Sequence, residues 1–111
     1  MNYIPHRYSG SVTGTVINLA SKGAQNLRFL TFLNTTAAVA YLQIFNLPST
    51  SVTIGTTAPA LSIGVPASAA IVLPIPEGGL CLGGDGLSVA GTTTRAGLTG
   101  ASQDINIGWG N

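Results

Sequence analysis

Few side chains in this sequence are suited to catalysis or metal binding, because it contains one His, one Cys and three acidic residues. These residues are His6, Glu77, Cys81, Asp85 and Asp104. A zinc site needs about four nitrogen, sulfur or oxygen ligands, usually at paired spacings, and no such spacing is present here. Cys81 lies between two leucines, which predicts a buried and inert thiol, since a cysteine nucleophile needs a neighbouring base. We therefore expect no metal, no cofactor and no enzymatic activity.

Two short motifs have both a chemical and a structural interpretation. Gly83–Gly86 contains a single acid, whereas calcium takes about six to eight oxygen ligands, so its glycines predict a tight turn. Asn34–Thr36 matches the N-glycosylation pattern. Because residues 1–8 contain no apolar secretion segment, we interpret this motif as a turn as well. The spacing of the three acids does not indicate the carboxylate pair that glycoside hydrolysis uses.

The composition points to permanent contact with other subunits. Charged residues make up 6% of the chain, against about 25% in an average soluble domain, and charge normally keeps isolated proteins apart. Four Lys and Arg residues are too few for a basic patch, so we expect no nucleic-acid binding. The most apolar stretch, 58–76, contains four prolines, which break a helix, so we expect no membrane span.

The hydrophobic pattern predicts strands and almost no helix. Residues 27–33 and 39–45 are aromatic and branched runs separated by a short polar turn, which predicts a central β-hairpin. We expect Phe29, Leu42 and Ile44 to be buried in it. Further strands are predicted at 11–19, 52–54, 61–65, 71–75, 80–82, 87–90 and 104–109. The chain is therefore predicted to be all-β, a jelly-roll-like β-sandwich of about eight short antiparallel strands that forms one domain over residues 11–111.

The first ten residues differ from the rest, since they contain two tyrosines, a histidine and an arginine around a proline. They predict an extended N-terminal arm, residues 1–10, that docks on a neighbouring protein, because Tyr and Arg are favoured at interfaces. The alternative is a frayed terminus. Trp109 is interpreted either as a stacking residue or as the residue that closes one end of the core. The candidate residues for an interface with another protein or another subunit are Tyr3, Ile4, His6, Arg7, Tyr8 and Trp109.

Three segments carry a family resemblance. Val39–Asn46 reads VAYLQIFN, Val52–Ala67 reads VTIGTTAPALSIGVPA, and Pro74–Leu82 reads PIPEGGLCL before a Gly/Thr/Ala-rich stretch. Together they resemble small structural proteins of tailed bacteriophages, over roughly residues 28–100. The chain departs from that pattern at Leu47–Ser51, where relatives often have Lys and Ala. The resemblance implies a β-sandwich without catalysis on the virion surface, and capsid decoration (cement) proteins of this kind are typically homotrimers.

From these observations we expect a bacteriophage virion structural protein, most specifically a decoration protein bound to the major capsid protein on the capsid surface. A tail, neck or fibre-base component is the first alternative. A small carbohydrate-binding module is the second, although such a module should display exposed aromatic side chains. Low charge favours a closed homo-oligomer, because a cyclic assembly buries a weakly charged surface without growing into a filament. The resemblance implies that this oligomer is a homotrimer, which matches the three-fold positions of an icosahedral shell.

Overall fold

Runs of branched and aromatic residues between glycines and prolines form short strands in this protein, as their β-propensity predicts. The computed structural model describes residues 6–110, which contain nine strands, one 3-10 helix and no α-helix. In chain order the elements are β1 His6–Val12, β2 Ile17–Ala20, β3 Asn26–Asn34, β4 Ala40–Phe45, η1 Ser49–Ser51, β5 Leu61–Val65, β6 Ala70–Val72, β7 Leu80–Cys81, β8 Leu87–Thr92 and β9 Gln103–Gly110. No helix in this part of the chain is long and apolar enough to cross a membrane.

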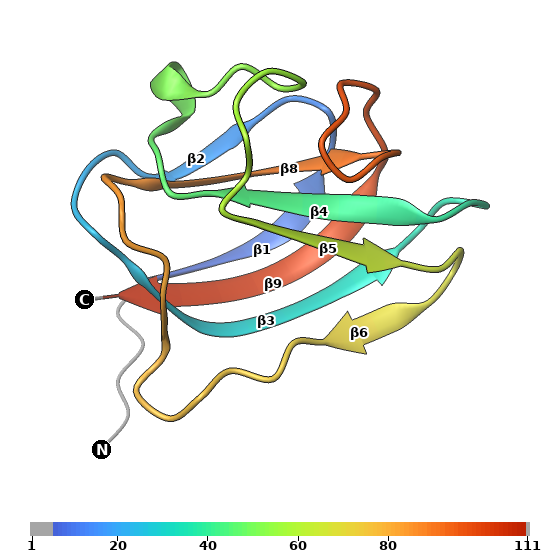
Figure 1. The fold of residues 1–111 in the computed structure, drawn as a ribbon. Coiled ribbons are helices and arrows are strands. Elements are labelled where there is room, and N and C mark those ends of the chain that lie inside the picture. Colours follow the sequence, from blue (N-terminus) through green and yellow to red (C-terminus); the bar gives the residue numbers. More distant parts are fainter. Residues whose placement is uncertain (1–5, 111) are drawn as a thin grey trace.

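The strands form two antiparallel sheets that pack together as a β-sandwich (Figure 1). Sheet A has the order β1-β9-β3-β6, with β7 also pairing with β3, and sheet B has the order β2-β8-β4-β5. Four of the pairs are nested in the sequence, namely β1 with β9, β2 with β8, β3 with β6 and β4 with β5. The predicted all-β sandwich of antiparallel strands is therefore confirmed.

The predicted central hairpin is wrong, because β3 lies in sheet A and β4 lies in sheet B. The polar segment between them crosses from one layer to the other. Asn34 holds this crossover: its side-chain nitrogen donates to the carbonyl oxygens of Ala38, Val65 and Pro66 at 2.7, 3.0 and 3.1 Å. Its side-chain oxygen accepts from the Thr36 amide at 2.9 Å. Asn34 is fully buried. The residues after it bend between β3 and β4, so the interpretation of this motif as a turn agrees with its place in the fold.

Apolar side chains from both sheets fill the space between the layers. The buried cluster consists of Val12, Leu27, Leu30, Phe32, Leu42, Ile44, Val65, Leu87, Val89, Ile105, Ile107 and Trp109. Leu42 and Ile44 are fully buried, as predicted. Phe29 is only half-buried and lies outside the cluster. A register shift between Leu27 and Phe29 changes the alternation, so Leu27 and Leu30 both point inward and Phe29 does not.

Loops cover the outer face of sheet B, and Figure 1 shows them above β4 and β8. Along β4, Leu42 and Ile44 face the core, so Gln43 and Phe45 face outward, yet both are fully buried. Over this face, the hydroxyl of Ser88 donates to the carbonyl oxygen of Leu47 at 2.9 Å. This loop contains the 3-10 helix η1, and residues 52–54 after it form no strand, so the edge strand predicted there is wrong.

The Gly-rich turn before β8 is confirmed, since Gly83, Gly84 and Gly86 all have positive φ. The carboxylate of Asp85 accepts the Gly23 amide at 2.7 Å, which ties this turn to the start of β3. A side chain at Gly84 would lie 2.2 Å from the backbone oxygen of Asn46. The turn therefore requires glycine at this position both for its backbone conformation and for its close contact.

Candidate interaction surface

The outer face of sheet A is a candidate surface for contacts, and strand register defines its composition. Cross-strand partners share a face, so Ser9, Asn106, Thr31 and Val72 form one row across β1, β9, β3 and β6. A second row, nearer the start of β9, consists of Ser11, Asp104, Leu33 and Ala70. The half of the face on β1 and β9 is polar, whereas the half on β3 and β6 is mainly apolar.

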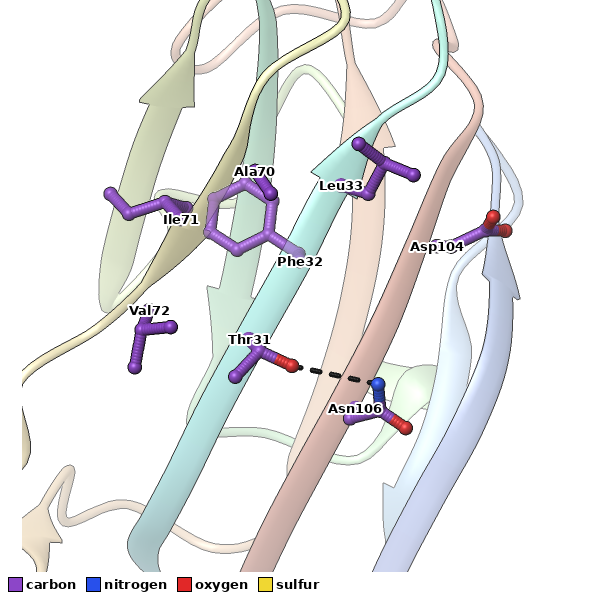
Figure 2. A pocket seen from close by; sticks show the side chains of 8 residues that line it. All are labelled: Thr31, Phe32, Leu33, Ala70, Ile71, Val72, Asp104 and Asn106. Atoms are coloured by element: carbon purple, nitrogen blue, oxygen red, sulfur yellow. Dashed lines mark hydrogen bonds between the residues drawn. The ribbon is translucent and has the colours of Figure 1, made fainter.

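Hydrogen bonds between side chains order the polar half of this face. The hydroxyl of Ser9 donates to the side-chain oxygen of Asn106. The hydroxyl of Ser11 donates to the carboxylate of Asp104 over 3.2 Å. The Asn106 nitrogen lies 3.5 Å from the hydroxyl oxygen of Thr31, which links the polar and apolar halves (Figure 2). These contacts are exposed to solvent, so they fix side-chain positions more than they stabilise the fold.

A shallow hollow of about 270 Å³ lies in the apolar half (Figure 2). Its lining residues are Thr31, Phe32, Leu33, Ala70, Ile71, Val72, Asp104 and Asn106. The hollow has a simple origin, because the small Ala70 and Thr31 stand between the larger Leu33 and Val72 in the two rows. Leu33 is 40% exposed and Val72 is 70% exposed, so the hollow presents apolar surface to solvent. We call this site the sheet A hollow.

The loop between β8 and β9, residues 93–100, forms a second exposed feature on the opposite layer. Leu98 is 69% exposed and Arg95 is exposed beside it. The Arg95 guanidinium carbon lies 5.7 Å from the centre of the Tyr41 ring, at a distance that permits a cation–π contact. The sequence identified this segment only as a loop that carries Arg95, because no local pattern shows that the loop presents a leucine to solvent.

The structure divides the predicted interface residues between two faces. His6, Tyr8 and Trp109 are on the core side of sheet A, since His6 pairs with Trp109 and Tyr8 with the buried Ile107. The imidazole of His6 stacks on the indole of Trp109, with ring centres 5.7 Å apart.

Trp109 is 6% exposed and belongs to the core cluster, as the core interpretation of this residue predicted. Arg7 pairs with Gly108 and is exposed on the outer face. Residues 6–10 of the predicted arm form part of β1 and pair with β9, so the predicted domain boundary after residue 10 falls within a strand. Tyr3 and Ile4 lie outside the described residues.

The chemically reactive residues are dispersed over the part of the chain that the structure describes. No group of three or more His, Cys, Asp or Glu side chains is placed there to hold a metal ion. The prediction that Cys81 is buried is wrong, because its thiol is exposed. The strand β7 is only two residues long and lies beside β3 at the margin of sheet A, so the flanking leucines turn inward while Cys81 faces solvent.

Comparisons with protein-family models, with curated proteins and with solved structures gave no match to this chain.

Proposed function

We propose that this protein is a structural component of a tailed-bacteriophage virion, and specifically a decoration protein that binds the assembled capsid surface. The observation that carries the proposal is the open outer face of sheet A. Loops cover the outer face of sheet B, whereas sheet A exposes Leu33 and Val72 beside polar side chains that include Asp104. Exposed apolar surface of this kind marks interaction sites, and a chain with 6% charged residues gains little protection from charge repulsion.

The topology supports the same proposal. The four nested strand pairs correspond to one long hairpin rolled into two layers, which supports the jelly-roll description. Double-sheet jelly rolls occur in viral capsid and lectin domains. The resemblance of residues 39–82 to phage structural proteins supports the viral role over the lectin role. The position of Trp109 also supports the viral role over the lectin role. Stacking against a sugar ring would require an exposed aromatic face, and Trp109 is buried in the core.

The proposed mechanism is stabilisation by binding, without any bond made or broken. A protein that binds the assembled lattice and not its separate subunits stabilises the lattice by RT ln(1 + [L]/Kd), which is about 2.7 kcal/mol at a hundredfold excess over Kd. We propose a homotrimer, because a three-fold assembly matches the three-fold positions of an icosahedral shell. Each bound trimer would then contact several neighbouring major capsid proteins, and the contacts would reinforce one another.

The proposal is tested with capsids that lack the protein. We expect purified protein to bind these capsids saturably and to raise the temperature at which they release DNA. Imaging of assembled virions should place the protein on the head surface. Density at the tail, neck or fibre base would instead favour the alternative virion location. Capsids that survive heating equally well with and without the protein would overturn the cementing role, and binding on a glycan array would favour the carbohydrate-binding alternative.

A further inference from the structure

We propose that the sheet A hollow of one copy of this chain receives the 93–100 loop of a second copy. This inference rests on the homotrimer of the proposed function and names the contact that builds it. The apolar half of the outer face of sheet A then serves the trimer, and the polar half on β1 and β9 remains for the capsid. The two features carry opposite charges, each exposes an apolar side chain, and they lie on different layers of the same sandwich. The apolar side chains at the two features are largely unburied in the single chain, since Val72 and Leu98 are 70% and 69% exposed.

The hollow has room for an aliphatic side chain, and its lining is mainly apolar. Its volume is about 270 Å³, below the range of roughly 300–1,000 Å³ that is usual for small-molecule sites. Figure 2 shows Leu33 on β3 and Val72 on β6 at the hollow, with Ala70 also on β6. The side chains of Thr31 and Asn106 hydrogen-bond to each other. The hollow therefore offers mainly apolar contacts to an incoming group.

The 93–100 loop presents Leu98 on a fixed support. The hydroxyl of Ser62 donates to the carbonyl oxygen of Arg95 at 2.7 Å, and the side-chain amide of Gln43 donates to that of Gly97 at 3.2 Å. The amide of Thr93 donates to the carbonyl oxygen of Thr99 at 2.9 Å and closes the loop at its base. Because the loop is already ordered, inserting Leu98 into a partner costs little further conformational entropy.

The charges of the two features are opposite. Arg95 is exposed on the loop, three positions before Leu98. Asp104 is the one ionisable residue that lines the hollow, and it is exposed at the margin beside Leu33. When Leu98 occupies the hollow, Arg95 and Asp104 come from different copies and meet at the rim. Rim charges of this kind mainly set orientation and association rate, so the apolar contact supplies most of the affinity.

The placement of the two features favours a closed ring. A loop that binds a hollow is a heterologous contact, which generates either a ring or a filament. The loop leads directly into β9, whose second residue is Asp104, and Figure 1 shows the loop at the end of the sandwich where β9 and β6 begin. Since both features lie at this one end, several copies can meet there around a common axis, and three copies close the contact in a trimer.

Sedimentation velocity on the purified full chain tests the contact. We expect the unmodified chain to sediment as a trimer, and Leu98→Asp or Val72→Asp to raise the dissociation constant of each contact by roughly tenfold or more. Both positions are exposed, so the resulting monomers should retain the circular dichroism and melting temperature of the unmodified chain. Growth of the unmodified chain into polydisperse polymers would overturn the closed ring.

Exchanging the charges of Arg95 and Asp104 distinguishes loss of the contact from a folding defect. Arg95→Asp and Asp104→Arg should each weaken the trimer, and the double variant should restore it, because the pair forms again with reversed sign. Lys22→Asp is the matched control, because it changes the net charge by the same amount as Arg95→Asp. Lys22 lies on the loop before β3, away from the hollow, so this variant should remain a trimer. A double variant that stays as weak as the single variants would overturn the pairing.

The outcomes separate this inference from the proposed function. If the unmodified chain is a monomer, both the proposed homotrimer and this contact fail. If the unmodified chain is a trimer and both Leu98→Asp and Val72→Asp remain trimers, this contact fails while the homotrimer stands. Variants that remain trimers but no longer bind capsids would assign the hollow or the loop to the capsid, and would also overturn the contact between copies.

Discussion

Replacing Asn34 by Ala should lower the free energy of unfolding by about 3–5 kcal/mol. Asn34 makes five hydrogen bonds through its side chain, three as donor and two as acceptor. The bond to the Val65 oxygen is buried, and leaving that oxygen without a donor costs about 1–3 kcal/mol. The other four bonds are only partly buried, and their groups regain water, so each contributes roughly 0.5 kcal/mol.

Urea unfolding followed by the fluorescence of Trp109 measures this loss, because that side chain lies in the core cluster. Asn106→Ala is the matched control, since it removes an exposed amide with hydrogen bonds at the surface; its effect should stay within about 1 kcal/mol. A domain of this kind is typically stable by roughly 5–15 kcal/mol, so Asn34→Ala removes a large share. A loss below about 1 kcal/mol for Asn34→Ala would show that Asn34 does not hold the crossover between the sheets.

Three further predictions follow from positions in the fold. The exposed thiol of Cys81 should react fully with a thiol reagent in the native protein, and a thiol that reacts only after unfolding would contradict its placement. Gly84→Ala should destabilise the protein by more than about 2 kcal/mol in thermal or urea unfolding, because the new methyl group meets the backbone of Asn46. Gly83 also has positive φ, but nothing lies close to the position of its new methyl group, so Gly83→Ala should cost about 1 kcal/mol. Phe45→Ala should cost about 3–5 kcal/mol, since Phe45 is fully buried, and half-buried Phe29 should cost clearly less in the same measurement; equal losses would refute this difference in burial.

Local alternation was sufficient to predict several strands. Leu61–Val65 and the stretch within β9 alternate apolar residues with Ser, Gly and Asn, and both are strands in the structure. The hairpin prediction failed because a short polar turn between two apolar strands fits a crossover between sheets equally well. The choice depends on contacts far along the chain, such as the bond from Asn34 to Val65, and on competition from β9 and β8 for the same strand edges.

The candidate surface was not predictable from the sequence for a similar reason. The hollow combines residues from β3, β6 and β9 that are separated by more than 30 positions and that meet only through strand register. The inward and outward alternation of β3 changes at Arg28, because a bulge lies between Leu27 and Phe29. This bulge excludes Phe29 from the core, and no glycine or proline in β3 marks it in the sequence. The predicted interface residues near the N-terminus were selected for residue type alone, and β1 separates them onto two faces.

The nested strand pairs have a consequence for how the chain folds as it is synthesised. The strand β9 lies between β1 and β3 in sheet A, although it follows every other strand in the sequence. Until the ribosome has released β9, β1 has no neighbour in its sheet, and the apolar residues that pack against β9 remain uncovered. Completion of sheet A must therefore wait for translation to pass residue 110. This step should be slow, because pairing strands that are distant in the sequence costs loop-closure entropy before the contacts form. A chain that ends before β9 would leave β1 unpaired and one edge of β3 open.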